Sequence, residues 1–339
     1  MIAYKKKEAR SWAWENLKGV YNVVIPSYSR DLTRLNENGI RHDIRRELEC
    51  GFSGTLLVSE TAVTLAEYGQ FVTWAHDEAK GRLKLVLQTS FNTLEENIEA
   101  AKISEAAGVE LALLTYPPSF YPRDLEEIYQ YTKTFCDNTN LAVMLFPVPT
   151  WGFDRLHGAD IPAPILRRLI DDCPNVVAIK AEGGYPGIMG QVECHRLFGK
   201  EVIVSCPMEN DMIPLAQILP IQLSATSNTE YFGSMIPHIF NLLQKKDYDE
   251  ATRLFWQTQP ARKANIVANA PSIAANMFIN RMIWKYQAWL QGFNGGPLRQ
   301  PTNKISEAVM NALRAGLAKS GLAPTESHNH EFFVGRNPD

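Results

Sequence analysis

The run Asn175-Val176-Val177-Ala178-Ile179-Lys180 decides the fold. Its four apolar positions are mostly β-branched and predict a strand buried on both faces, as in parallel sheets. Lys180 comes at the carboxyl end, which is the edge where barrels of parallel strands keep their chemistry. On this segment alone, a strand-end lysine that simply reaches solvent is the more common case. A partly desolvated amine at that edge would instead lose its proton readily and attack carbonyl groups.

Strand-like runs alternate with amphipathic helical runs eight times along the first part of the chain. The runs that we predict as strands are 20–25, 54–58, 83–87, 109–114, 141–146, 176–180, 201–205 and 221–224. Such alternation indicates a parallel sheet with crossover helices. Eight repeats favour an α/β fold of the closed (β/α)8 TIM barrel type. An open doubly wound sheet is the alternative, but no Gly-x-Gly-x-x-Gly follows the first strand.

Capping signals mark where several of the crossover helices begin. Thr64 and Thr93 each precede a helical pattern and have a glutamate three residues on, Glu67 and Glu96, which predicts two capping boxes. Asp124 opens a further helix after a pair of prolines. These positions separate the helices from the strands that precede them.

The pattern is helical alone after the barrel, with runs at 249–256, 273–289 and 304–320. We therefore predict a barrel with a short N-terminal extension over residues 1–245 and a C-terminal helical appendage over 246–321. The last stretch, 322–339, is polar and is expected to be a tail, one that could lie on a neighbouring subunit.

The composition excludes several classes of protein. The chain has 339 residues, of which 45% are hydrophobic and 21% charged, as in soluble globular proteins. Its net charge of −3 implies no nucleic-acid partner, and no apolar run approaches a membrane span or a signal peptide. Five widely spaced cysteines without C-x-x-C are typical of a reducing cytoplasm. Because the seven histidines show no ligand spacing, we expect no metal and no other cofactor.

Three segments carry a resemblance to a known family. They are Val176–Lys180, the run Leu223-Ser224-Ala225-Thr226-Ser227-Asn228, and Gly295-Gly296-Pro297-Leu298-Arg299-Gln300-Pro301. In these the chain resembles a divergent member of the dihydrodipicolinate synthase and N-acetylneuraminate lyase family. The resemblance implies a (β/α)8 barrel with extra C-terminal helices, a homotetramer, and a small 2-oxo acid substrate. It also implies that Lys180 forms the imine and that Ser224 belongs to the site.

Two loops depart from the family's pattern. After the second strand, where the family has Gly-Thr-Thr-Gly-Glu, this chain has Leu57-Val58-Ser59-Glu60-Thr61. Ser59 can still hold a substrate carboxylate, whereas an inward Glu60 would oppose it and could act as a base. After the fifth strand, Phe146 replaces the family's proton-relaying tyrosine, and Trp151 stands where an arginine often binds a second carboxylate. Both changes favour an apolar or aromatic partner group.

The missing tyrosine leaves the proton relay unassigned. The candidates are Tyr116, Tyr121, Ser205, Glu60 and a water held by Thr115. Packing at the barrel rim is the alternative role for the two tyrosines. We expect Glu182, two residues after the lysine, to face away from the site or to cap the next helix.

Three functions remain open. The first is a carbon–carbon or carbon–oxygen lyase, an aldolase or hydratase-aldolase that acts through a lysine imine on a pyruvate-like 2-oxo acid with an apolar or aromatic partner group. The second is a sugar-acid dehydratase or aldolase of the same family, against which the loss of polar groups at Phe146 and Trp151 counts. The third is a barrel that binds 2-oxo acids without turnover.

Overall fold

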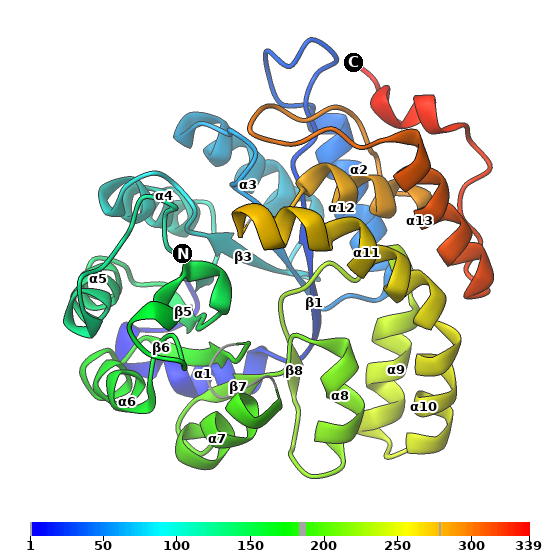
Figure 1. Ribbon diagram of the computed structural model, residues 1–339. Coiled ribbons are helices and arrows are strands. Elements are labelled where there is room, and N and C mark those ends of the chain that lie inside the picture. The colour runs from blue at the N-terminus through cyan, green and yellow to red at the C-terminus, as the bar shows by residue number, and fades with distance from the viewer. Residues whose placement is uncertain (1, 183–187, 278) are drawn as a thin grey trace. The chain divides into compact units, whose positions relative to one another are not determined.

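The computed structural model describes residues 2–182, 188–277 and 279–339, and the chain forms two compact units (Figure 1). Unit 1 contains Met1–Tyr21 and Lys84–Ser227, and unit 2 contains Asn22–Leu83 and Asn228–Asp339. The predicted boundaries at residues 245 and 321 do not coincide with this division and remain predictions.

The eight predicted strands are all present and join one sheet in the order β7-β6-β5-β4-β3-β2-β1-β8. Their bounds are β1 Gly19–Val24, β2 Gly54–Leu57, β3 Lys84–Gln88, β4 Leu111–Leu113, β5 Ala142–Leu145, β6 Val176–Lys180, β7 Ile203–Ser205 and β8 Leu223–Ser224. The described pairs are parallel, and β1 pairs with β8 through Gly19 and Leu223. The Cys206 amide after β7 donates to the Leu223 carbonyl at 3.2 Å. The prediction of a (β/α)8 barrel is therefore confirmed.

Helices of unit 1 connect its strands, and α5, α6 and α7 lie outside β5, β6 and β7 (Figure 1). The helices of this unit are η1 Lys6–Glu8, α1 Ala9–Asn16, α4 Leu94–Ala106, α5 Leu125–Asp137, η2 Pro149–Trp151, η3 Phe153–Arg155, α6 Ala163–Asp172, α7 Ile188–Phe198 and α8 Glu209–Ala216. The Asp124 side chain accepts from the Glu127 amide, as predicted. Thr93 also caps its helix, but Glu96 accepts from the Asn92 amide at 2.9 Å, so this capping box is displaced by one residue.

Strand β6 has the predicted bounds, and all five of its residues are buried. It lies between β5 and β7, with Leu145 opposite Ile179 and Ser205 opposite Lys180. Strand β6 has a neighbouring strand on each edge and helices on its outer face. Its side chains are therefore covered, which explains why the run is almost wholly apolar. The register places Lys180 at the carboxyl edge, next to the end of β7.

Unit 2 consists mostly of helices. They are α2 Glu37–Cys50, α3 Leu65–Ala79, η4 Glu230–Phe232, α9 Met235–Gln244, α10 Tyr248–Gln257, α11 Gln259–Asn276, α12 Arg281–Leu290, α13 Glu307–Lys319 and η5 Asn329–Phe333. The capping box of Thr64 and Glu67 is present at the start of α3, as predicted.

The single helix predicted over 273–289 is wrong. Helix α11 ends at Asn276, because Met277 adopts a left-handed backbone conformation with φ of 51°. Helix α12 then begins after Asn280, whose side chain accepts a hydrogen bond from the Met282 amide. Helix α11 instead starts earlier than predicted, at Gln259.

The polar stretch 322–339 packs within unit 2 instead of extending as a tail. The Phe332 side chain is fully buried, with its ring centroid 5.3 Å from that of Tyr286 and 5.9 Å from that of Trp289. The Arg336 guanidinium donates to the carbonyls of Phe293 and Trp289 at 3.0 and 3.1 Å. These contacts make the last residues part of the core of unit 2.

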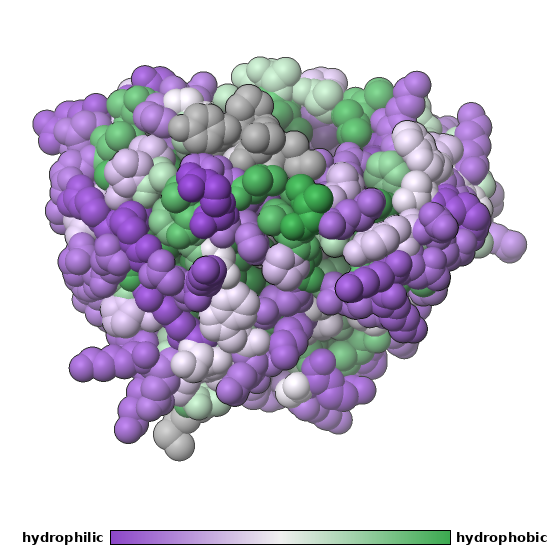
Figure 2. Space-filling model, turned by 90° about the horizontal axis from the view of Figure 1, so that it is seen from below, coloured by the Kyte–Doolittle hydropathy of each residue, from purple (hydrophilic) through white to green (hydrophobic). Residues whose placement is uncertain are grey.

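Hydrophilic side chains cover most of the face in Figure 2, in keeping with the charged content of the chain. Of the helices in the described residues, none combines the length and the apolar character that crossing a membrane requires.

Candidate active site

Lys180 is buried at the carboxyl end of β6 and contacts two groups that stabilise a positive charge. Its side chain is 7% exposed, and its Nζ lies 2.9 Å from Oε1 of Glu182. The same nitrogen lies 3.7 Å from the centroid of the Phe146 ring, over its face. A carboxylate and an aromatic face both favour the ammonium form. Before it can attack a carbonyl, the amine must therefore pass a proton to an acceptor, and the Glu182 carboxylate is in contact with it.

The expectation that Glu182 faces away from the site or caps the next helix is wrong. In extended chain, alternate side chains point to the same side, so residue 182 follows residue 180. The backbone stays close to this geometry just beyond the strand, since the Ala181 amide still donates to the Ser205 carbonyl at 3.4 Å. The period of two along the strand was the signal that could have identified Glu182. Gly183 and Gly184, quoted with the lysine motif, lie outside the described residues.

A second acid and a thiol belong to the same environment. Burial, followed by the charge of Glu182, raises the pKa of Asp211 at the start of α8. Burial, followed by the charge of Asp211, raises the pKa of the Cys206 thiol to about 12. The thiol therefore stays protonated and is a poor nucleophile.

Phe146 and Trp151 form an aromatic wall beside the lysine. The Trp151 indole Nε1 donates to the Phe146 carbonyl at 2.6 Å, and the two rings meet edge to face with centroids 5.6 Å apart. This hydrogen bond uses the one polar group of the indole. The wall therefore offers π faces and apolar edges, with no free donor for a carboxylate or a sugar hydroxyl.

The geometry around Tyr116 and Tyr121 favours packing over proton transfer. The Tyr116 ring lies edge to face on Trp151 at 5.8 Å, but its hydroxyl bonds the Thr132 hydroxyl at 2.6 Å. Burial raises the pKa of this phenol. Tyr121 is 77% exposed and stacks against the guanidinium of Arg155 at 3.8 Å. Neither hydroxyl has a contact with the lysine among those described.

The hydroxyls at neighbouring strand ends bond to the protein itself. The Ser205 hydroxyl donates to the Ala225 carbonyl and accepts from the Ala225 amide, both at 2.9 Å. The Thr115 hydroxyl bonds the Ser90 hydroxyl at 3.1 Å. Ser224 is buried in β8, opposite Val20 of β1. The bonds of Ser205 and Thr115 connect neighbouring strand ends of unit 1.

Ser59, predicted to hold the substrate carboxylate, and Glu60, predicted as a substrate-site residue and possible base, belong to unit 2. Ser59 is buried. Glu60 forms an ion pair with Arg281, in which Nε lies 2.9 Å from Oε2. The guanidinium neutralises this carboxylate, so Glu60 is not an uncompensated negative charge.

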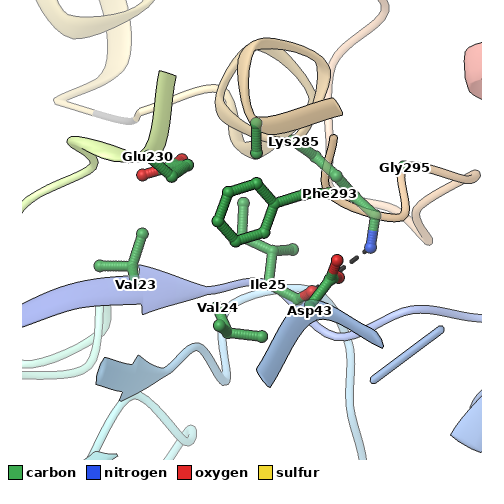
Figure 3. A pocket seen from close by; sticks show the side chains of 9 residues that line it. Val23, Val24, Ile25, Asp43, Glu230, Lys285, Phe293 and Gly295 are labelled. Carbon is green, nitrogen blue, oxygen red and sulfur yellow. Dashed lines mark hydrogen bonds between the residues drawn. The ribbon is translucent and has the colours of Figure 1, made fainter. Parts of the chain in front are cut away.

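A buried charged cluster in unit 2 was not predicted from the sequence. The Lys285 ammonium faces the Asp43 carboxylate, and Glu230 lies nearby around a cavity of about 10 Å³ (Figure 3). Lys285 also donates to the Pro26 carbonyl at 2.6 Å. Burial raises the pKa of Asp43 to about 6 and that of Glu230 to about 8, and it lowers the pKa of Lys285 to about 8. The cavity has room for about one water molecule, which makes it too small for a substrate.

In residues 2–182, 188–277 and 279–339, no group of three or more histidine, cysteine, aspartate or glutamate side chains is placed to hold a metal ion.

Comparison with known proteins gives consistent matches over nearly the whole chain. Residues 16–319 match the model described as the dihydrodipicolinate synthetase family. An N-acetylneuraminate lyase of Clostridium perfringens is 28% identical over 299 residues, covering 87% of this chain and 96% of that protein. A 4-hydroxy-tetrahydrodipicolinate synthase of Clostridium tetani is 24% identical over 276 residues, covering 80% and 85%. The crystal structure of dihydrodipicolinate synthase from Aquifex aeolicus superposes with a TM-score of 0.75 at 17% identity, covering 91% of this chain and 100% of that one.

Proposed function

Because the chain belongs to the dihydrodipicolinate synthetase family, we propose that it is a lyase whose Lys180 forms an imine with a pyruvate-like 2-oxo acid. The observation that carries this proposal is the contact of the buried Lys180 with Glu182 at the carboxyl end of β6. An amine in this position is the nucleophile that imine formation requires, and the carboxylate is a proton acceptor within hydrogen-bond reach.

Glu182 takes the place of the relay tyrosine in the proposed mechanism. Its carboxylate accepts a proton from the Lys180 ammonium, and the neutral amine adds to the ketone carbon to give a carbinolamine. The protonated Glu182 then donates to the departing hydroxyl, water leaves, and the imine forms. In an aldol cleavage the C4 hydroxyl passes its proton to the Glu182 carboxylate, the C3–C4 bond breaks with its electrons drawn to the imine, and the partner leaves as an aldehyde with an enamine remaining. In a dehydration Glu182 first removes a proton from C3 to give the enamine, which then expels the C4 hydroxyl as water when Glu182 returns the proton. Of the remaining candidates, Tyr121 is exposed, and the others bond to other groups in the protein, which supports this assignment: Tyr116, Ser205, Glu60 and Thr115.

The proposed partner group is apolar or aromatic, as in an aldolase or hydratase-aldolase. Phe146 and Trp151 present rings beside the amine, and the indole N–H is already bonded to a backbone carbonyl. A carboxylate or polyol against this wall would lose its hydration without gaining partners. This argues against a sugar-acid dehydratase or aldolase, although the N-acetylneuraminate lyase relative keeps that function as the second candidate.

Borohydride trapping tests the imine directly. Pyruvate, 2-oxobutyrate and phenylpyruvate are each incubated with the protein and borohydride, and the adduct is located by peptide mass spectrometry. We expect a reduced adduct on Lys180 in the parent protein and none on that peptide in Lys180→Ala. Lys200→Ala removes an exposed lysine of the same unit and serves as the matched control. An adduct of unchanged yield in Lys180→Ala would contradict the proposal.

A turnover assay distinguishes an enzyme from a 2-oxo acid binding barrel. Aryl and alkyl aldol adducts of pyruvate are offered, and the release of pyruvate is measured with lactate dehydrogenase. Release that depends on Lys180 supports the lyase, whereas trapping without release would identify a barrel that binds 2-oxo acids without turnover.

We also propose a homotetramer in the cytoplasm. The tetramer rests on the family resemblance, and the location on five cysteines that are all free and buried. Light scattering at micromolar concentration should give about four times the chain mass of 38.2 kDa. A monomer mass would contradict the assembly.

A further inference from the structure

The five cysteines are all free, and two of them lie against each other in unit 1. Cys136 is in the last turn of α5, and Cys173 is the residue at which α6 ends. Their thiols are joined by a hydrogen bond, in which Cys136 donates to Cys173. The pair has no role in the proposed chemistry, because it lies before β6 and Lys180 is the last residue of that strand.

Polar contacts to the backbone hold the two helix ends together. The Asn175 side chain, two residues after Cys173, donates to the Cys136 carbonyl at 3.1 Å. Lys6 of η1 donates to the same carbonyl at 2.5 Å. Arg10 of α1 donates to the Cys173 carbonyl at 3.2 Å. Sulfur atoms in hydrogen-bond contact on a backbone held in this way are close to the separation that a disulfide needs, and side-chain rotation closes the remainder.

The electrostatic environment distinguishes Cys173 from the other cysteines. The hydrogen bond from Cys136 lowers the pKa of the Cys173 thiol more than burial raises it, and the positive charge of Lys133 acts in the same direction as the hydrogen bond. Burial raises the pKa of three other thiols to about 12: Cys50, Cys194 and Cys206. Because the thiolate is the form that reacts with oxidants, Cys173 is the favoured nucleophile and Cys136 is the thiol beside it.

Both side chains are buried, but each lies one residue from the surface at a helix end. Cys136 is followed by the exposed Asp137, and Cys173 lies between the exposed Asp172 and Pro174. The last turns of helices fray at a low cost in free energy, which gives a small oxidant transient access. Oxidation of this pair is therefore slower than that of a surface thiol and requires a small oxidant.

We propose that Cys136 and Cys173 are a redox pair that hydrogen peroxide oxidises to an intramolecular disulfide. The Cys173 thiolate attacks one peroxide oxygen, the O–O bond breaks, and hydroxide leaves and takes up the proton that the thiol released, so that a sulfenic acid forms. The Cys136 sulfur then attacks the Cys173 sulfur, its proton passes to the departing hydroxyl, and the S–O bond breaks with release of water. In total, two thiols and one hydrogen peroxide give one disulfide and two water molecules, and two electrons pass from sulfur to oxygen.

The test treats the full, reduced chain with hydrogen peroxide in the absence of denaturant. Catalase stops the reaction, and iodoacetamide in urea then blocks the remaining thiols. Trypsin should release the peptides 134–155 and 169–180 joined to each other, at a mass about 2 Da below their sum. The number of blocked thiols should fall by two from the five of the reduced chain. Separate peptides with oxygen on Cys173, or a link that forms only when urea is present during oxidation, would overturn the proposal.

Matched variants separate this pair from an effect of exposure alone. Cys194 of α7 is the most exposed of the five cysteines at 8%, so a reaction governed by exposure would begin there. Cys194→Ser should leave the linked peptides unchanged, whereas Cys136→Ser and Cys173→Ser should each abolish them. Lys133→Gln should slow formation of the link about two- to fivefold, as expected for one partly exposed charge, whereas Lys102→Gln on α4 should not.

Other results are distinguishable from the proposed one. A disulfide between two chains, or a link that joins another pair of cysteines, refutes the proposal. Circular dichroism confirms folding, and if a serine variant is unfolded, alanine at the same position replaces it. The peptide map of the parent does not depend on any variant. Because oxidation of the pair does not require an imine, failure of borohydride trapping at Lys180 leaves this test unaffected.

Discussion

Replacing Glu182 by glutamine separates two effects that the carboxylate has on Lys180. The first is that the charge keeps the amine protonated. At 2.9 Å, two unit charges attract each other by about 6 kcal/mol at an effective dielectric constant of 20. Glu182 is one-fifth exposed, and water weakens the attraction, so about 1.5–3 kcal/mol is the better value for this charged hydrogen bond. Removing it would weaken the preference for the ammonium form and so raise the neutral fraction of the amine.

The second effect is proton transfer, and the magnitudes decide the net result. Loss of a general acid–base group slows a reaction by about 10²–10⁴-fold. Glu182→Gln should therefore form the imine more slowly than the parent. The loss should be partly masked at neutral pH, where the variant has more neutral amine than the parent, and should grow towards about 10²–10⁴-fold as the pH rises.

The assay is the rate of borohydride-trapped adduct with pyruvate, measured from pH 6 to 10 by quenched flow. Glu193→Gln is the matched control, because Glu193 lies on α7 of the same unit and pairs with Arg196. Its profile should match that of the parent. If Glu182→Gln forms the imine as fast as the parent or faster at every pH, Glu182 only holds the ammonium and the relay assignment is refuted.

Three further predictions concern the wall, the packing and the buried acids. Trp151→Arg should shift the ratio of kcat/KM roughly tenfold or more from aryl towards dicarboxylate substrates, and a parent enzyme that already prefers dicarboxylates would contradict the polarity argument. Tyr116→Phe should cost about 0.5–1.5 kcal/mol in urea unfolding, since it removes the bond to Thr132, with trapping unchanged within about twofold; a large loss of trapping would return Tyr116 to the relay. Burial raises the pKa of Glu230 from 4.5 to about 8. The folded state therefore keeps a proton that the unfolded chain loses. The contribution of this group to the free energy of unfolding is fully present below about pH 4.5 and is lost as the pH rises through 8. Glu230→Gln should therefore be more stable than the parent at pH 9, by about 1–3 kcal/mol in urea unfolding; equal stability at pH 6 and 9 in both proteins would be inconsistent with this.

The barrel and its lysine could be predicted because each strand carries its own signal. Val176–Lys180 is apolar throughout, and such a run is needed where both faces of a strand are covered. The aromatic wall also followed from the order of residues after β5, because Phe146 and Trp151 lie in one short loop. Local patterns of this kind do not depend on distant parts of the chain.

The partners of polar groups could not be predicted in the same way. Arg281 pairs with Glu60 across more than 200 positions of sequence, and Lys285 faces Asp43 from a different helix. Nothing local marks these pairs, since charged residues are common on helices. The break before α12 had a weak local signal, the helix-capping Asn280, that the apolar periodicity on either side outweighed.

Unit 2 is made of two separate stretches of the chain, and this affects the order in which the two units can fold during synthesis. Its two parts, Asn22–Leu83 and Asn228–Asp339, are separated by the whole of Lys84–Ser227. A ribosome adding 5–20 residues per second takes roughly 7–30 s to cross that interval. Throughout it, the nascent α2 lacks the later part of its unit, and the contact of Phe332 with Trp289 forms only after both have been synthesised. Unit 1 can gather most of its strands before the later part of unit 2 is synthesised, whereas unit 2 cannot fold fully until Asn228–Asp339 has followed.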